Sequence, residues 1–299
     1  MPQLKLSEYP QFTDEHIAFR STIREFAEKE LAPYRHEWDK AGQFPREVFS
    51  MLADIGALGI RFPEEYGGLG LDWWYTLAFQ EGISWARNAG LVMSILVDSD
   101  MATPIIAEIG TKEQKEEFLA PVIRGEKVAA LGVSEPDCGS DVSAITTTAR
   151  KDGGDYVING AKTYITNGAF ADFITLAVRT GDAGHHGISL VLFPTDTPGF
   201  SVGRKLDKLG TRSVDSCELH FDNCRIPQRN LLGHENAGFI YIMQNFQGER
   251  LTVELEDGRV ISVPLGIHWP DIDEDLSAEG LLRGQLAPGY RRPPGRQAS

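Results

Sequence analysis

The feature that most constrains the fold is a change in residue pattern at Val128. Before this position apolar residues recur at helical spacing. After it come short segments rich in β-branched and aromatic residues, separated by Gly, Asp and Asn. A helical pattern returns after Asn236, with Phe239, Ile242, Met243 and Phe246 on one face. This order predicts an α+β protein with an N-terminal helical domain and an antiparallel β domain.

The first part of the chain offers clear helix boundaries. Thr13 or Asp14 can cap the first helix, and Pro33 is expected to end it. The loop FPEEYGGLGLD carries turn residues and separates two later helices. Further helices are expected over residues 45 to 58, over residues 73 to 99, and from a cap at Thr111 to about residue 125.

The pattern changes again after Arg250. LTVELEDGRVISVPL contains two alternating runs about an Asp257-Gly258 turn, which predicts a β-hairpin. The following tail is rich in Pro, Gly and Arg, a composition typical of disorder. The expected domains are a helical domain (1–127), a β domain (128–232), the first helix of a shortened domain (233–251) and an unrelated hairpin and tail (252–299).

Charge and cysteine content narrow the function classes. The net charge of −14 argues against nucleic-acid or anionic-membrane binding, which need a basic face. The three cysteines, Cys138, Cys217 and Cys224, are too scattered for a disulfide framework or a zinc pair, so reduced thiols and a cytoplasmic protein are expected. The N-terminus lacks an apolar signal core, and no run reaches the 18 apolar residues of a membrane span.

Two segments of the β domain could hold a ligand. In ALGVSEPDCGSD, residues 130 to 141, the Ser134 and Ser140 hydroxyls and the backbone at Gly139 could hold a pyrophosphate without much positive charge. The alternative is a purely structural role, a β-turn in which Ser and Gly serve only the turn geometry. In GAKTYITNGAFAD, Tyr164 and Thr166 fall on one side of a regular strand and could face a flavin ring. The alternative is an ordinary cross-strand pair.

Four motifs, taken in order and spacing, resemble the acyl-CoA dehydrogenase family. They are S-E-P-x-x-G-S-D, K-T-Y-I-T-N-G, K-L-G-T-R-S-x-D-S-x-E-L-x-F-D-N-C-R-I-P and N-x-x-G-F-I-Y-I-M-Q-N-F-Q-G-E-R-L, and the EEYGGLGLD loop fits as well. The resemblance covers about 250 residues. It implies a helical domain, a β-barrel-like middle domain and a C-terminal four-helix bundle.

The resemblance also implies a cofactor and its contacts. FAD would lie against residues 131 to 140, with contacts from Leu131, Val133, Ser134, Gly139 and Ser140. A second set of flavin contacts would be Tyr164, Ile165 and Thr166, with Thr166 near the flavin N5 edge and Tyr164 along the ring. Ser140, Gln247 and Arg250 would contact the acyl-CoA substrate.

The reaction implied by the resemblance forms a trans-2-enoyl-CoA. A Glu removes the α proton of the thioester while the β hydrogen leaves as hydride to flavin N5, and Glu249 stands where some subfamilies place this base. Without the resemblance, Glu249 would be an ordinary solvated helix residue. An electron-transfer flavoprotein or similar protein is the implied electron acceptor, and a homo-oligomer is implied for the family.

The segment after Arg250 departs from the family pattern. It resembles a small bacterial domain of unknown function instead of the remaining bundle, so weak FAD binding, impaired activity and doubtful oligomerisation are expected. The alternative is a flavin-free binding or assembly module that retains the first two domains. A yellow colour of the purified protein would distinguish the two. A helical interaction protein is disfavoured because it leaves both polar segments of the β domain unexplained.

Overall fold

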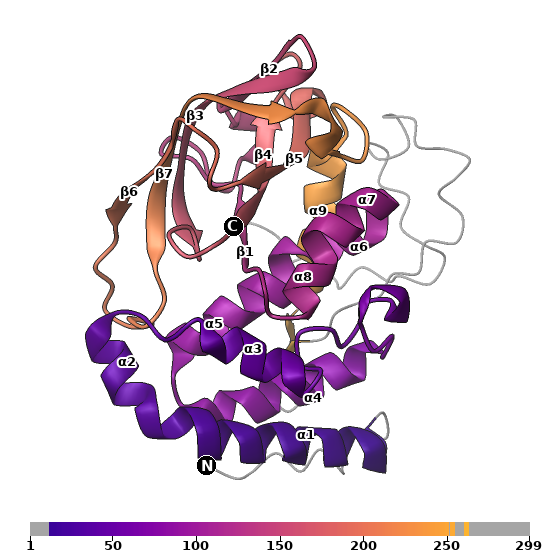
Figure 1. Ribbon diagram of the computed structural model, residues 1–299, viewed down its shortest axis with the longest axis vertical. Coiled ribbons are helices and arrows are strands. Elements are labelled where there is room, and N and C mark those ends of the chain that lie inside the picture. Colours follow the sequence, from indigo (N-terminus) through magenta and orange to yellow (C-terminus); the bar gives the residue numbers. More distant parts are fainter. Residues whose placement is uncertain (1–11, 251, 255–259, 263–299) are drawn as a thin grey trace, which may run out of the picture. The chain divides into compact units, whose positions relative to one another are not determined.

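The computed structural model describes residues 12–250, 252–254 and 260–262 (Figure 1). As predicted, the described residues before Val128 are mainly helical. They are α1 (Asp14–Phe26), α2 (Arg35–Ala41), α3 (Glu47–Asp54), α4 (Trp73–Ile83), α5 (Ala89–Leu96), α6 (Pro104–Ile109), α7 (Lys112–Gln114) and α8 (Ala120–Ile123). π-Helical or 3-10 turns join several of them, at 27–34, 84–86, 97–102 and 115–119.

The predicted cap of α1 is confirmed, and two predicted helix ends are wrong. The Thr13 hydroxyl accepts from the His16 N–H, while the His16 ring accepts from the Thr13 N–H, which completes a capping box. Helical turns continue through Pro33 to Ala41, because Pro33 lies in the first turn of a new segment, where its missing N–H is not needed. The second helix, α3, ends at Asp54, before Gly56 turns the chain with a φ of +73°.

The β domain holds one sheet of eight strands. The strands are β1 (Ala129–Gly132), β2 (Thr148–Asp152), β3 (Asp155–Thr166), β4 (Phe173–Arg179), β5 (Ile188–Pro194), β6 (Phe200–Lys205), β7 (Ser216–Pro227) and β8 (Leu231–Leu232). Their order is β6-β7-β3-β2-β4-β5-β8, with β1 paired to β4. Most neighbours are antiparallel, as predicted.

The sheet is nevertheless mixed, because two of its pairings are parallel and were not expected from the sequence. β1 pairs in parallel with β4, Ala129 facing Phe173, and β2 makes one parallel contact with β4. A long loop separates β1 from β2, so these two strands are not joined as a tight hairpin. β1 is instead almost fully buried beside β4, as is typical of a parallel strand covered on both faces.

A buried carboxyl group fixes β1 to the helical part of the chain. Asp98 Oδ1 accepts from the Ala129 N–H at 2.6 Å. Burial raises the Asp98 pKa well above its ordinary value. The helical stretch from Ala89 to Ile109 that carries Asp98 is long and apolar enough to cross a membrane by length and composition, but 67% of its most apolar window is buried inside the protein. That burial is the environment of a core helix.

One hydrophobic cluster joins the helices to the sheet. Phe118 packs edge-on against Phe173 of β4, with ring centroids 5.0 Å apart. The last helix, α9 (Gly238–Arg250), adds the buried Ile242 to the same cluster and lies against β5. After it, β9 (Thr252–Glu254) and β10 (Val260–Ser262) pair antiparallel, as the predicted hairpin requires. The Asp257-Gly258 turn and the tail from residue 263 lie outside the described residues.

The glycine-rich loop before α4 depends on a close backbone approach at Gly68. A Cβ at this position would lie 2.0 Å from the Phe62 carbonyl oxygen. We expect Gly68→Ala to lower the free energy of unfolding by about 2 kcal/mol, because the backbone must move to admit the methyl group. A Cβ at Gly154 meets nothing within 4 Å, so Gly154→Ala is the matched control. Equal urea midpoints for the two variants would contradict this account of the loop.

Candidate functional site

The two polar segments of the β domain lie side by side. The Thr163 N–H in β3 donates to the Ser134 carbonyl oxygen, just after β1, at 2.9 Å. This bond places the loop after β1 directly against the residue that precedes Tyr164. The sequence motifs that are about 25 residues apart therefore form one local structure.

A buried ion pair joins the same two segments. Lys162 Nζ lies 2.8 Å from Glu135 Oε1, and their side chains are 0% and 2% exposed. Lys162 also donates to the Val133 carbonyl oxygen at 3.0 Å. Sequence reasoning missed both residues. The signal was available, because a charged residue stands next to a proposed contact in each of the two motifs.

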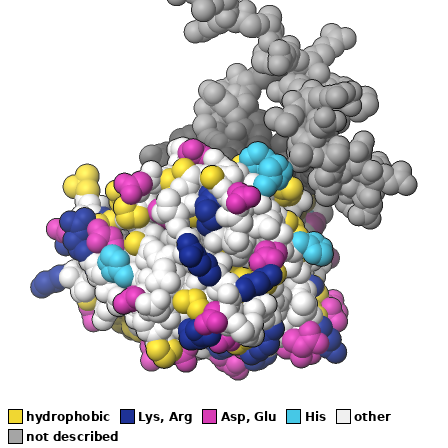
Figure 2. All heavy atoms as spheres, turned by 90° about the horizontal axis from the view of Figure 1, so that it is seen from above, with side chains coloured by type: hydrophobic (Ala, Val, Ile, Leu, Met, Phe, Trp, Pro, Cys, Tyr) yellow, Lys and Arg dark blue, Asp and Glu magenta, His cyan; other side chains and the backbone are white. Residues whose placement is uncertain are grey.

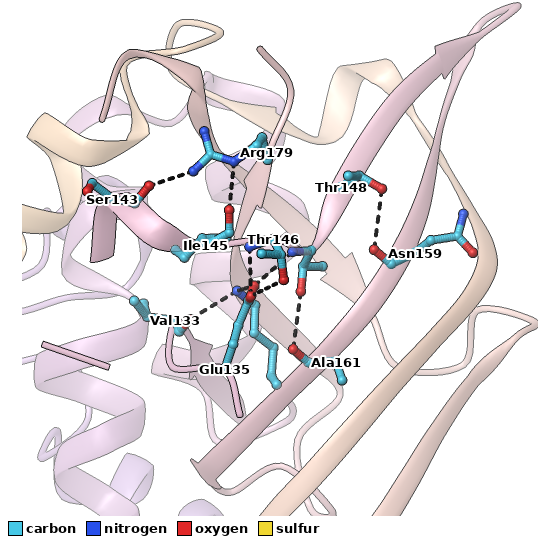
Figure 3. Close-up of polar contacts among 11 residues, drawn as sticks. Val133, Glu135, Ser143, Ile145, Thr146, Thr148, Asn159, Ala161 and Arg179 are labelled. Atoms are coloured by element: carbon cyan, nitrogen blue, oxygen red, sulfur yellow. Dashed lines mark hydrogen bonds and ion pairs between the residues drawn. The ribbon is translucent and has the colours of Figure 1, made fainter. Parts of the chain in front are cut away.

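The Glu135 carboxylate gathers a third segment as well. It accepts from the Thr146 N–H and hydroxyl, both at 2.7 Å, and from the Thr147 N–H at 2.9 Å. In Figure 3 the dashed lines from Thr146 converge on Glu135, beside Val133 at the end of β1. These three hydrogen bonds and the lysine satisfy a group that would otherwise be costly to bury.

These contacts keep the pair ionised at neutral pH. Burial by itself raises the pKa of the Glu135 carboxyl, but the Lys162 charge and the hydrogen bonds outweigh it and lower that pKa to about 2. Burial lowers the pKa of the Lys162 ammonium to about 8, and the Glu135 charge opposes the shift. Both values leave the two groups charged between about pH 4 and pH 7.

Beyond Glu135 the loop turns outward. The Glu135 N–H donates to the Cys138 carbonyl and the Cys138 N–H donates back to Glu135, which closes a tight turn. Gly139 and Ser140 follow it and are exposed. Within residues 12–250, the N–H groups of Gly139 and Ser140 donate to no protein acceptor, and a Cβ at Gly139 would meet nothing within 4 Å. Backbone N–H groups that donate to no protein acceptor are available to an anionic ligand.

Tyr164 stands out in the second segment. It is 68% exposed and has a φ of +60°, which is rare for a residue with a side chain. The pairing of β3 with β7 slips between Lys162 and Ile165, so Tyr164 lies in a β-bulge. Such backbone strain persists only where neighbouring structure holds it, and it concentrates at functional sites.

The bulge changes the strand geometry assumed from the sequence. Simple alternation cannot place Tyr164, because the strand is irregular there. Ile165 is buried, whereas Thr166 is half-buried. In the first segment Leu131 is half-buried, Val133 is buried and Ser134 is half-buried. An exposed aromatic ring, a hydroxyl at the strand end and free amides nearby form a set that fits a flavin with its pyrophosphate.

Asn167 holds the end of β3, and sequence reasoning missed this role too. Its φ is +64°, and its side-chain amide donates to the carbonyls of Ser94 and Ala129 at 3.0 and 3.2 Å. The Ser94 hydroxyl donates to the Asn167 Oδ1 at 2.6 Å. Asn167 thereby ties β3 to both α5 and β1. The T-N-G sequence signalled a turn here, but not a buried anchor.

The remaining predicted residues lie in α9. This helix is anchored by Asn245, whose amide donates to the Met101 carbonyl at 2.7 Å. Gln247, Glu249 and Arg250 belong to its last turn, but their side chains lie outside the described residues. The roles assigned to these three residues stay predictions.

Other candidate groups show no sign of a second reactive centre. The three cysteines are free, and burial raises the pKa of each thiol. His185 and His186 are exposed. In the described part of the chain no group of three or more His, Cys, Asp or Glu residues could hold a metal ion. Seen from above, basic and acidic side chains are interspersed on the visible face (Figure 2).

The Glu135 pKa predicts an acid-sensitive fold. Because the folded-state pKa is below the ordinary 4.5, the stabilisation is complete above about pH 4.5 and is lost as the pH falls toward 2. We expect the stability difference between the unaltered protein and Glu135→Gln to shrink by about 2 kcal/mol between pH 5 and pH 3. Urea unfolding at both pH values measures it. A difference that stays constant or grows would show that the carboxylate is not stabilised in the folded state.

Comparison with known proteins gives a consistent family. The model of the acyl-CoA dehydrogenase N-terminal domain matches residues 13–126, and that of the middle domain matches residues 130–224. The mitochondrial long-chain specific acyl-CoA dehydrogenase of Rattus norvegicus is 40% identical over 245 residues, 81% of this chain and 56% of the relative. The chain thus spans little more than half the length of that relative.

Solved structures agree with the sequence matches. A probable acyl-CoA dehydrogenase from Mycobacterium abscessus is 43% identical, with a TM-score of 0.77 over 79% of this chain and 63% of that one. A glutaryl-CoA dehydrogenase from Mycobacterium smegmatis, solved in complex with FADH2, is 29% identical, with a TM-score of 0.73 over 80% of this chain and 60% of that one. Both domains, their order and their fold therefore agree, and the chain belongs to the acyl-CoA dehydrogenase family.

Proposed function

We propose that this chain binds FAD and takes part in the α,β-dehydrogenation of an acyl-CoA thioester. The observation that supports it most directly is the junction of the two segments through the bond between Thr163 and Ser134. This bond brings the loop that carries the free Gly139 and Ser140 N–H groups next to Tyr164, which is exposed and has a strained backbone. Family membership supports the proposed reaction class, and the local geometry supports the proposed position of the cofactor.

In this proposal each segment has its own part of the cofactor. The amides of Gly139 and Ser140 would hold the pyrophosphate, since hydrogen bonds from backbone N–H groups can replace a positive charge. Tyr164 would lie along the flavin ring, and Thr166 would donate to its edge. Leu131, Val133, Ser134 and Ile165 complete the proposed cofactor contacts.

The proposed chemistry separates two hydrogens of the substrate. When bound, FAD supplies the two-electron acceptor for the β hydrogen, and the product is a trans-2-enoyl-CoA. Glu249 takes the α proton onto its carboxylate as the general base. Ser140, Gln247 and Arg250 orient the thioester. A packed α9, held at Asn245, would set the position of the base.

The proposed electron acceptor rests on family membership, and the proposed location rests on the cysteines. An electron-transfer flavoprotein or a similar protein is the proposed electron acceptor, and a cytoplasmic location is proposed from the reduced cysteines. The competing function is a binding or assembly module without flavin. FAD affinity separates the two, because the competing function predicts none.

The first test concerns Tyr164. We expect Tyr164→Ala to weaken FAD binding about fivefold, because an aromatic contact of this kind contributes about 1 kcal/mol. Quenching of flavin fluorescence on titration measures the dissociation constant. Tyr34→Ala is the matched control, since Tyr34 is also an exposed tyrosine but lies among the N-terminal helices. Equal losses in both variants, or none in either, would remove Tyr164 from the site.

The second test concerns the base. We expect Glu249→Gln to lower acyl-CoA-dependent dye reduction by a factor of about 100 or more, since a general base typically contributes that much. FAD affinity should be unchanged, because Glu249 is proposed to act on the substrate alone. A panel of acyl-CoA thioesters covers the open question of chain length. Full turnover in the Gln variant would assign the proton to another group.

A further inference from the structure

We propose that the buried Glu135–Lys162 ion pair is a positioning element that fixes the spacing of the two flavin-binding segments. This inference rests on the proposed function for its consequence, but its structural part stands alone. Neither residue is a proposed cofactor contact. Each lies within two residues of one: Glu135 follows Ser134, and Lys162 precedes Tyr164 by two residues.

The contacts of Lys162 show how β3 is held. Its ammonium group donates both to Glu135 and to the Val133 carbonyl at the end of β1. Lys162 is also the last residue in register with β7 before the bulge that contains Tyr164. Movement of Lys162 would therefore shift the start of the bulge relative to the loop after β1.

The contacts of Glu135 show how the loop is held. Its side chain is bound to Thr146 and Thr147, just before β2, while its backbone closes the turn with Cys138. The exposed residues Gly139 and Ser140 leave from that turn. A single carboxylate therefore connects the cofactor loop to the segment just before β2 and, through Lys162, to β3 (Figure 3).

A role in stability alone accounts poorly for this arrangement. Burying two charges costs desolvation energy that their attraction only partly offsets, and a packed apolar pair of similar volume is often at least as stable. An ion pair with directed hydrogen bonds instead restricts the relative position of the groups it joins. Such restriction is what a cofactor site needs, because small displacements of the contacting groups reduce binding and rate strongly.

The test compares two kinds of variant. Lys162→Met breaks the pair, and Glu135→Gln with Lys162→Met replaces it by neutral groups of similar length. Arg225→Met is the control, because Arg225 lies 2.7 Å from Asp152 in an ion pair that is at least half exposed on both sides. Hydrogen exchange in protein without FAD reports the local order of residues 134–141 and 163–166. FAD affinity and the visible circular dichroism of the bound flavin report the site itself.

If the pair has a positioning role, the double variant must lose the order of the two segments even where it keeps thermal stability. We expect exchange of the hydrogen-bonded amides of Glu135, Cys138 and Thr163 to rise at least about tenfold in the single and double variants, while amides in β4 and β5 are unchanged. The double variant should recover much of the thermal stability lost in Lys162→Met. It should not recover FAD affinity or the flavin circular dichroism. The control should behave like the unaltered protein in every measurement.

Three results would decide against or redirect the inference. If the double variant keeps the exchange protection and FAD affinity of the unaltered protein, the pair has no positioning role. If Lys162→Met does not fold, Glu135→Gln is read in the same way, since it retains the shape of the side chain. If the unaltered protein binds no FAD, the proposed function is wrong. The exchange data alone then show whether the ion pair fixes the positions of the two segments.

Discussion

The candidate site depends on a single buried charge pair between a loop and a strand. Glu135 and Lys162 are excluded from water, and each also binds backbone groups of a neighbouring segment. Removal of either partner would leave the other as an unpaired buried charge, which a fold tolerates poorly. The pair therefore links the order of the cofactor loop to the order of β3. Exposed Gly139, Ser140 and Tyr164 can be mobile at their tips and still keep their places relative to one another.

Hydrogen bonds between the helices and the strands hold β1 and the end of β3 beside this pair. Asp98 fixes the start of β1 through Ala129, and Asn167 ties the end of β3 to Ser94 and Ala129. β1 is thus held at one end by the helices and at the other by Lys162. Because β1 is buried beside β4, it is a rigid support for the loop that follows it.

The sequence predicts much of this structure, and its failures have physical causes. Hydrophobic periodicity located the helices and strands, and the cap at Thr13 follows from local chemistry alone. The parallel pairing of β1 could not be read, because strand partners depend on long-range packing. The bulge at Tyr164 was also missed, since alternation assumes a regular strand. Glu135 and Lys162 were hidden by the usual expectation that charged residues are exposed. A charge placed inside two adjacent ligand motifs is the signal to look for in similar chains.

The central claim is that the loop after β1 and the end of β3 form one flavin-binding surface. Hydrogen exchange of the unaltered chain with and without FAD tests it most directly, because it locates binding without relying on turnover. The account predicts that FAD slows exchange at residues 136–141 and 163–166 together, at the same half-saturating concentration, and leaves β6 unaffected. Protection of only one segment, or of neither while FAD binds elsewhere, would contradict it.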